Sequence, residues 1–292
     1  MRIKRVAAVA AVAALALGLT ACGGDDGGEG TGADSKSFTA GTTMEKLNKA
    51  QKIKVGTKFD QPGFGLKGLS GKPEGFDVEI AKIIVKELGI PADKIEWVEA
   101  PSKVREDVIV NGTVDLVAAT YTINDKRKER IAFAGPYYEA GQNILVKKDD
   151  TTITGPDSFK DGTKKVCSVT GSTPAETIKQ YVKDVGTQLV LFDTYDKCRD
   201  ALKGGQVDAV TTDNVILLGY IAKDEASFKL AGSNFTKEPY GIGVKKEDAD
   251  FRSFINDTLD KAVADGSWKK AWDGTAGKFG AELGSAPTIN RY

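Results

Sequence analysis

The strongest constraint on the fold is an alternation of strand-like and helix-like segments that occurs twice along the chain. The first series contains a strand at 53–57, a helix at 77–88, a strand at 95–98, a helix at 104–110 and an apolar strand at 114–119. Alternating polarity indicates the first strand, and apolar residues four positions apart indicate the first helix. This order of segments predicts parallel α/β layers.

The second series begins near residue 164 and repeats the pattern. It contains strands at 165–169, 189–192 and 207–211, with helices at 174–185 and 195–203 between them. The segments 111–117 and 204–210 are nearly alike, which either duplication or the shared physics of a helix end, a glycine turn and a buried strand explains. At about 100–200 residues per domain, the 292 residues accommodate two lobes with cores of their own.

The sequence also predicts the start of one helix and the structure of the C-terminal part. Thr173 precedes Pro174, and Glu176 stands three residues after Thr173, so we expect a capping box at the start of the helix 174–185. Helical spacing returns over 251–263, and a short helix carries Trp268 and Trp272. We expect the remainder of the chain to be irregular.

The composition excludes several classes of function. The chain has no histidine, which removes the usual general base and the commonest metal ligand. The 41 basic and 41 acidic residues balance, and no basic stripe is present, so we expect no nucleic-acid partner. Walker A, Cys-x-x-Cys and Gly-x-Ser-x-Gly motifs are absent, and we therefore expect no catalytic residues, no cofactor and no metal.

The N-terminus is typical of a secreted lipoprotein. Residues 1–21 combine a basic start with a short apolar run, which predicts a signal peptide. Leu19-Thr20-Ala21-Cys22 looks like a bacterial lipoprotein cleavage box, so Cys22 is predicted to be lipidated and to anchor the protein to the cell membrane. The alternative is an ordinary cleaved signal with an incidental cysteine. Residues 22–37, rich in glycine and acidic residues, are expected to form a flexible tether.

The other two cysteines would then lie outside the cytoplasm, where disulfides persist. We predict that Cys167 and Cys198 pair, with two buried free thiols as the alternative.

One segment formally matches the dinucleotide-binding fingerprint. Gly63-Phe-Gly65-Leu-Lys-Gly68 follows a strand, but residues 69–73 interrupt the chain where that motif needs a helix to start. We interpret the segment as a mobile loop over a binding cleft.

A longer set of motifs resembles the family 3 extracellular solute-binding proteins, the polar amino-acid receptors of ABC importers. The resemblance rests on Gly75-Phe-Asp77-Val-Glu-Ile80, Gly112-x-Val-Asp-Leu-Val117, Thr120-x-Thr-Ile123, Arg127, Phe133-x-x-Pro-Tyr137, Gly171-Ser-Thr173 and Val207-Asp-x-x-x-x-Asp213. It implies a two-lobed periplasmic-binding-protein-like fold of type II, in which mainly parallel sheets are flanked by helices. Lobe 1 would be 38–141 plus 242–292 and lobe 2 would be 142–241, with hinge crossovers near 141–144 and 239–243.

The resemblance also implies the ligand contacts. Arg127 would grip the α-carboxylate of an amino acid, and Asp213 would accept from its α-ammonium. Thr120 and Thr122, at a strand end, would add hydroxyl and backbone contacts, and Ser172 and Thr173 would offer N–H groups. The alternatives are that Arg127 is a solvated surface residue, that Asp213 caps a helix at 215–220 and that the Thr173 hydroxyl serves as a cap.

The side-chain pocket is predicted to be cationic. Lys58 ends the first strand, and Ser102 and Arg105 lie in a segment similar to the one that contacts the distal carboxylate in glutamate and aspartate receptors. Because Arg127 and Asp213 neutralise the zwitterion, Lys58 and Arg105 leave a surplus positive charge for glutamate first and aspartate second. Exposed placement of Lys58 and Arg105 is the alternative.

The expected function is therefore an extracytoplasmic, lipid-anchored, monomeric receptor that delivers an acidic amino acid to an ABC transporter permease. Glutamine or another polar amino acid is the alternative ligand. A dehydratase-type enzyme on the same fold and a signalling receptor are the alternatives of other classes.

Overall fold

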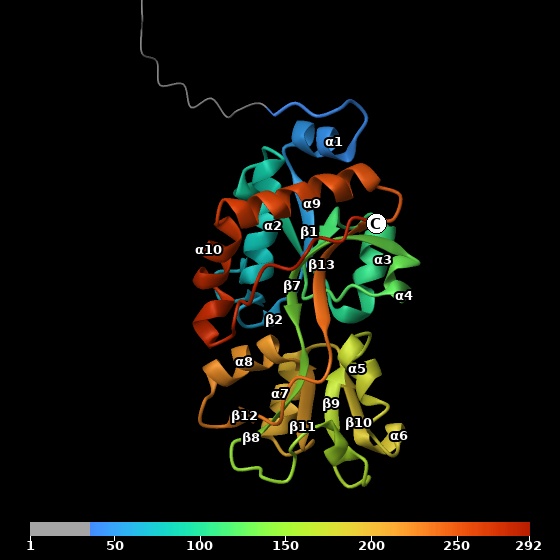
Figure 1. The fold of residues 1–292 in the computed structure, drawn as a ribbon, viewed down its shortest axis with the longest axis vertical. Coiled ribbons are helices and arrows are strands. Elements are labelled where there is room, and N and C mark those ends of the chain that lie inside the picture. Colours follow the sequence, from blue (N-terminus) through green and yellow to red (C-terminus); the bar gives the residue numbers. More distant parts are fainter. Residues whose placement is uncertain (1–35) are drawn as a thin grey trace, which may run out of the picture. The chain divides into compact units, whose positions relative to one another are not determined.

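The computed structural model describes residues 36–292, which belong to one compact unit (Figure 1). The predicted signal peptide, Cys22 and nearly all of the 22–37 tether lie outside the described residues. The first helix, α1 (Thr43–Ala50), starts after Thr42, whose side chain accepts from the Glu45 N–H group.

The first sheet has five strands in the order β5-β1-β6-β13-β7. Their bounds are β1 Ile53–Thr57, β5 Ile95–Glu99, β6 Leu116–Val117, β7 Ile131–Ala140 and β13 Glu238–Lys245. Strand β1 is parallel to β5 and β6, whereas β13 is antiparallel to β6 and β7. The parallel strands are those that the first αβ series predicted.

The second sheet also has five strands, in the order β10-β9-β11-β8-β12. Their bounds are β8 Gln142–Lys147, β9 Val166–Val169, β10 Leu189–Phe192, β11 Ala209–Asp213 and β12 Phe228–Leu230. Strands β9, β10 and β11 run parallel, and β8 and β12 are antiparallel additions. We call each sheet with its covering helices a lobe.

The chain passes between the lobes twice. Strand β7 of the first lobe continues through Gly141 into β8 of the second, and the chain returns by β13, which pairs with β7 from Glu238 onward. The interlobe segments lie beside each other in Figure 1. A Cβ at Gly141 would lie 2.8 Å from the carbonyl oxygen of Thr236, so this crossing is closely packed.

Helices cover both sheets. Those of the first lobe are α2 (Phe76–Glu87), α3 (Arg105–Val110), α4 (Asp125–Lys128), α9 (Ala249–Ala264) and α10 (Ser267–Gly274), and those of the second are α5 (Thr173–Ile178), α6 (Val185–Gln188), α7 (Tyr195–Lys203) and α8 (Asn214–Lys223). Helix α9 packs on β7 and contacts α2 and α10. Short 3-10 turns occur at Ala92–Lys94, Ser102–Val104, Pro156–Phe159 and Ala276–Phe279.

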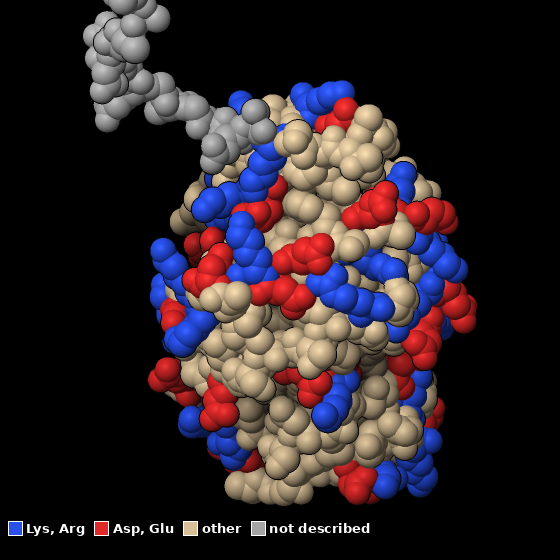
Figure 2. Space-filling view, turned by 45° about the horizontal axis from the view of Figure 1, so that its top comes forward, with Lys and Arg blue, Asp and Glu red and all other residues tan. Residues whose placement is uncertain are grey.

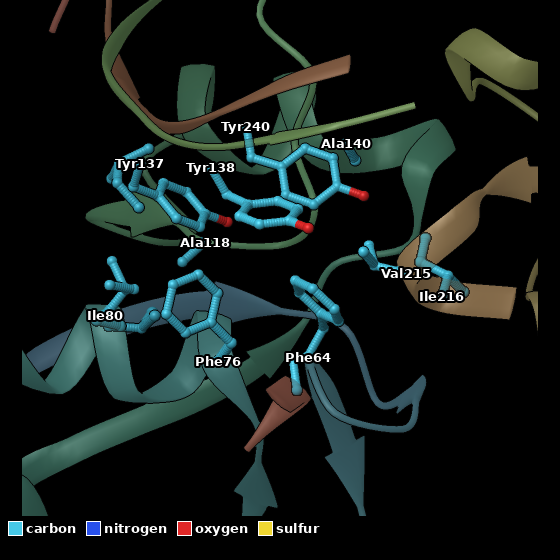
Figure 3. Close-up of a cluster of buried hydrophobic side chains, with 14 of the residues drawn as sticks. Phe64, Phe76, Ile80, Ala118, Tyr137, Tyr138, Ala140, Val215, Ile216 and Tyr240 are labelled. Atoms are coloured by element: carbon cyan, nitrogen blue, oxygen red, sulfur yellow. The ribbon is translucent and has the colours of Figure 1, made fainter. Parts of the chain in front are cut away.

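An aromatic cluster forms the core beneath the lobe junction (Figure 3). The Phe76 and Trp272 rings meet edge to face at 5.1 Å, and the Tyr138 and Trp272 rings stack at 4.8 Å. Phe64 and Tyr240 complete the cluster, with ring centroids 6.0 Å apart. Each such pair contributes about 0.5–1.5 kcal/mol beyond area burial, so the cluster holds α2 and α10 against β7 and β13.

The supposed mobile loop at 63–68 is part of a small three-stranded sheet. Strands β2 (Asp60–Gln61), β3 (Gly65–Lys67) and β4 (Pro73–Glu74) pair antiparallel. The interpretation as a mobile loop was wrong because Phe64 is fully buried and anchors the turn. The glycines permit close packing, since a Cβ at Gly65 would lie 2.5 Å from the Lys58 carbonyl oxygen.

The helix predicted at 174–185 ends at Ile178. Beyond it, the N–H groups of Lys183 and Asp184 donate to the buried side chain of Gln188 instead of to carbonyls one turn earlier. The predicted capping box was also wrong. Ser172 is the cap and accepts from the Ala175 N–H group.

The surface carries mixed charges, as Figure 2 shows for one face, where basic and acidic side chains alternate. Among residues 36–292, no helix is long and apolar enough to cross a membrane.

Candidate ligand-binding site

A small cavity lies between the two lobes. It is lined by Ser102, Arg105, Thr120, Thr122, Ser172, Thr173, Pro174, Tyr195, Thr212, Asp213 and Ile216. The first four come from the first lobe and the others from the second. All the predicted ligand residues except Lys58 and Arg127 therefore line one cavity.

The lobes touch directly around this cavity. Asp60 of the first lobe accepts from the Tyr195 N–H group at 2.8 Å through its carboxylate, and its carbonyl accepts from the Tyr220 hydroxyl at 2.8 Å. The Thr173 hydroxyl donates to Glu238 Oε2 at 2.7 Å, and its oxygen lies 3.2 Å from the Thr122 hydroxyl. The Thr173 hydroxyl thus links the lobes and does not cap α5.

Arg105 is the guanidinium group inside the cavity. It is 2% exposed, donates to the carbonyl oxygens of Ala119 and Thr120 at 2.8 and 3.3 Å, and lies 4.1 Å from the centre of the Tyr121 ring. Its Nε atom is buried without a hydrogen-bond partner among the described residues. A buried donor without a partner costs free energy unless a ligand atom accepts its hydrogen bond.

Lys58 lies behind Ser102, away from the cavity wall. It is 3% exposed, and its Nζ donates to Ser102 Oγ at 2.8 Å. The pKa of Lys58 is lowered to about 7, mainly by burial and also by the neighbouring Arg105, while Asp60 opposes the shift. The alternative of exposed placement is therefore wrong for both Lys58 and Arg105.

Arg127 faces a hollow at the mouth of the cleft, which shares Ser102, Ser172 and Thr173 with the inner cavity. Its Nε lies 3.2 Å from Glu106 Oε1, and its two terminal nitrogens donate to the carbonyl oxygens of Thr122 and Gly171 at 2.6 and 3.1 Å. Burial lowers its pKa to about 10, with Arg105 adding to the shift.

The interpretation of Arg127 as a surface residue was wrong, because it is 7% exposed. These contacts use three of the five guanidinium N–H groups, and two remain for a ligand.

Asp213 ends β11 and faces the cavity from the second lobe. Its Oδ2 accepts from the Tyr240 hydroxyl at 2.5 Å, whereas Oδ1 is buried with no partner within residues 36–292. Its pKa is raised to about 8, mainly by burial and also by the nearby Glu238. Asp213 occupies the N-cap position of α8, but its side chain makes no capping bond to any described residue, so the capping interpretation was wrong.

Thr120 and Thr122 lie in an irregular segment after β6, because that strand ends at Val117. The prediction that they lie at a strand end was wrong in this respect. Thr120 has a φ of 44°, which is costly for a β-branched residue. The conformation is held by hydrogen bonds from its N–H group to Asp77 Oδ2 at 2.7 Å and from its hydroxyl to Gln61 Oε1 at 3.0 Å.

Ser172 offers less to a ligand than expected. Its N–H group donates to the Val169 carbonyl oxygen, and its hydroxyl accepts from the Ala175 N–H group.

Several residues of the site were not anticipated from the sequence. Tyr195, Thr212, Pro174 and Ile216 line the cavity, and Asp77, Glu106 and Glu238 contact its polar residues. Of these residues, only Asp77 could have been found from the sequence, because it is an acidic residue within the apolar first turn of a helix. Burial raises its pKa to about 7, although the Tyr137 hydroxyl donates to it at 2.5 Å.

The predicted disulfide is present. Cys167 on β9 and Cys198 on α7 are bonded, with Cα atoms 5.5 Å apart, and both side chains are fully buried.

The sequence profile of the bacterial extracellular solute-binding proteins, family 3, matches residues 53–274. The chain belongs to this family. The glutamate-binding protein GluB of Corynebacterium efficiens is 41% identical over 276 residues, which is 91% of this chain and 88% of that protein. The glutamine-binding protein of Geobacillus stearothermophilus is 40% identical and covers 78% of this chain and 86% of that protein.

Solved structures of the same architecture are also similar. An ancestral arginine-binding protein bound to arginine is 36% identical with a TM-score of 0.72, covering 77% of this chain and 98% of that one. The ancestral amino acid-binding protein AncCDT-1, a precursor of cyclohexadienyl dehydratase, is 29% identical with a TM-score of 0.73, covering 80% and 99%.

These similarities settle the class of protein. The sheets and helices form the two-lobed fold of type II, as the motifs predicted. The relatives at 40% identity and above are binding proteins, so this family member is a binding protein and not an enzyme. Its family places it outside the cytoplasm.

Proposed function

We propose that the protein binds an acidic amino acid, glutamate first and aspartate second, in the cleft between the lobes, at the residues that line the inner cavity and the adjoining hollow beside Arg127. The observation that carries the proposal is a pair of buried atoms, Arg105 Nε and Asp213 Oδ1, that have no partner among the residues described and belong to residues that line the inner cavity from different lobes. A donor from one lobe and an acceptor from the other fit a ligand that carries both signs of charge.

The α-amino and α-carboxylate groups have candidate partners. Asp213 Oδ1 accepts from the α-ammonium, and the two unused N–H groups of Arg127 donate to the α-carboxylate. Ser172 and Thr173 lie where the cavity meets the hollow at Arg127, and the Thr122 carbonyl oxygen accepts from Arg127, so these residues complete that end of the site.

The distal carboxylate would lie at Ser102 and Arg105, with Lys58 behind them. The Lys58 ammonium already donates to the Ser102 hydroxyl, which leaves that hydroxyl free to donate to a ligand oxygen. The buried acids Asp60 and Asp77 offset part of this positive charge, which the sequence-based charge count did not include. Glutamine therefore remains the alternative ligand, in line with the glutamine-binding relative.

The test of acidic selectivity is the ratio of glutamate to glutamine affinity in Arg105→Met. The substitution keeps much of the side-chain volume and removes the charge. We expect glutamate affinity to fall about 100-fold and glutamine affinity less than tenfold, because a charge-assisted bond contributes about 1.5–3 kcal/mol. Arg291→Met, at the exposed ion pairs with Asp257 and Asp260, is the matched control. An unchanged ratio in Arg105→Met would remove the cationic pocket from the proposal.

Delivery to an ABC transporter permease completes the proposed function. Ligand closure of the two lobes would present one surface to the permease, with the protein held at the membrane by lipid on Cys22 and acting as a monomer. Deleting the gene and measuring uptake of labelled glutamate tests this role. Normal uptake would favour a signalling receptor instead.

A further inference from the structure

The C-terminal segment 275–292 lies beyond the residues that match the family profile, yet it is built into the first lobe. After the 3-10 turn at Ala276–Phe279, it runs across the lobe from α10 toward α3 and α4, as the red trace in Figure 1 shows. The Tyr138 hydroxyl donates to the Glu282 carbonyl oxygen at 2.9 Å, which anchors the start of this crossing.

The end of the segment covers the free edge of the first sheet. Strand β7 is the edge strand, and an uncovered edge presents unpaired backbone groups. The Asn290 N–H group donates to the Gly135 carbonyl oxygen at 2.8 Å, and the Tyr292 hydroxyl accepts from the Phe133 N–H group at 2.8 Å. The last residues therefore occupy a defined register along β7.

Tyr292 then reaches the helix that carries Arg127. The Tyr292 ring lies 4.6 Å from Lys128 Nζ of α4 and 4.3 Å from the Arg252 guanidinium of α9, which also donates to the Tyr292 carbonyl oxygen. Helix α4 spans only Asp125–Lys128, and its start depends on the bond from the Arg127 N–H group to Asn124 Oδ1. A helix of one turn has little stability of its own, so it depends on such external contacts.

We infer that Tyr292 is a positioning residue for Arg127, linking α4 to β7 and α9 so that the guanidinium stays at the mouth of the cleft. This inference rests on the proposed role of Arg127 in carboxylate binding. Because glutamate and glutamine share the α-carboxylate, the contribution of Tyr292 is common to both ligands and independent of the selectivity that Arg105 provides.

The experiment uses residues 36–292 with Tyr292→Ala and two readouts. The first is amide hydrogen exchange at Arg127, Lys128 and Arg130, which needs no ligand. We expect these amides to lose about tenfold in protection while α2 is unchanged. The second is titration with glutamate and with glutamine. We expect both affinities to fall by a common factor of roughly 3 to 30, with their ratio preserved.

Two variants separate positioning from general stability. Tyr292→Phe keeps the ring beside both cations and is expected to restore most of the protection and affinity. Arg291→Ala removes exposed ion pairs to Asp257 and Asp260 in the same segment and is expected to leave both readouts unchanged.

Unchanged α4 exchange and unchanged affinities in Tyr292→Ala, whatever the melting temperature does, would overturn the inference. If the wild-type chain binds neither amino acid, the proposed function fails, and the exchange data alone decide whether Tyr292 orders α4.

Discussion

The Tyr240 hydroxyl donates to Asp213 Oδ2 at 2.5 Å, although the two residues belong to strands of different sheets. Tyr240 lies on β13, which crosses back into the first lobe, and Asp213 ends β11 of the second. The bond holds one carboxylate oxygen and leaves the other directed at no described partner. The crossing strand thus orients the acid that we assign to the ligand ammonium.

Asp213→Asn tests this assignment with almost no change in shape. We expect glutamate affinity to fall at least 100-fold, because the neutral amide loses the charge-assisted bond to the ammonium. The ligand-free protein should be no less stable, since asparagine is neutral like the protonated carboxyl that it replaces and no buried charge is created. Calorimetry and thermal unfolding measure the two effects. Retained affinity would place the ammonium elsewhere.

The contact between the lobes at Pro62 depends on a glycine in α8. A Cβ at Gly219 would lie 2.4 Å from the Pro62 carbonyl oxygen of the first lobe. Gly219→Ala is expected to raise the dissociation constant roughly tenfold or more by obstructing this contact. The second lobe itself should not lose stability, because alanine favours a helix interior by about 1 kcal/mol over glycine.

Gly274→Ala is the matched control for this prediction, since a Cβ there meets no described atom within 4 Å. It should leave binding unchanged. Equal binding by both variants in calorimetric titration would mean that the contact at Pro62 is not part of the ligand-bound state.

The stability of the ligand-free protein should fall as pH rises from about 5 to 7. Burial raises the pKa of Asp77 to about 7 and that of Asp213 to about 8, so the folded state keeps protons that the unfolded state releases above pH 4. Each such group lowers the free energy of unfolding by up to about 1.4 kcal/mol per pH unit until its folded pKa is passed.

Above pH 7 the lowered pKa of Lys58 acts in the opposite direction, because there the unfolded lysine binds the proton more strongly. The decline should therefore flatten. Denaturant unfolding at each pH measures the profile, and Asp213→Asn should reduce its slope. A wild-type profile that rises from pH 5 to 7 would contradict the buried, protonated carboxyls.

The disulfide should stabilise the second lobe. Cys167 and Cys198 are 31 residues apart, and closing such a loop is typically worth about 3–4 kcal/mol. We expect the double variant Cys167→Ala, Cys198→Ala to lose about that much free energy of unfolding. Because both side chains are buried, part of the loss reflects lost packing. Comparison with reduced wild type, which keeps both side chains, separates the contribution of the bond from that of packing. Equal stability of oxidised and reduced protein would contradict this prediction.

The parallel strands were predictable because their signal is local. Alternating polarity in Ile53–Thr57 and the apolar run at 114–119 each mark a strand within a few residues. The early end of α5 was not predictable in the same way. It depends on Gln188, whose side chain reaches the backbone of Lys183 and Asp184 only in the folded lobe.

The site residues differ in the same way: some are marked by the local sequence, and others are placed only by tertiary contacts. Arg105 and Asp213 are found by motif position, because the family pattern encodes their place at the ends of elements. Tyr195 and Glu238 reach the cavity region from segments with no such pattern, brought there by the lobe contacts. Arg127 is a mixed case, since its motif was clear but its pairing with Glu106 depends on the approach of α3.

The most direct test of the central claim is calorimetric titration of residues 36–292, refolded free of bound ligand. The ligands to titrate are glutamate, aspartate, glutamine and a basic amino acid. The account predicts that glutamate binds most tightly, aspartate next, and glutamine at least tenfold more weakly. Tighter binding of glutamine or of the basic amino acid would contradict the cationic pocket of Lys58 and Arg105, and no binding of any of the four would contradict the amino-acid receptor itself.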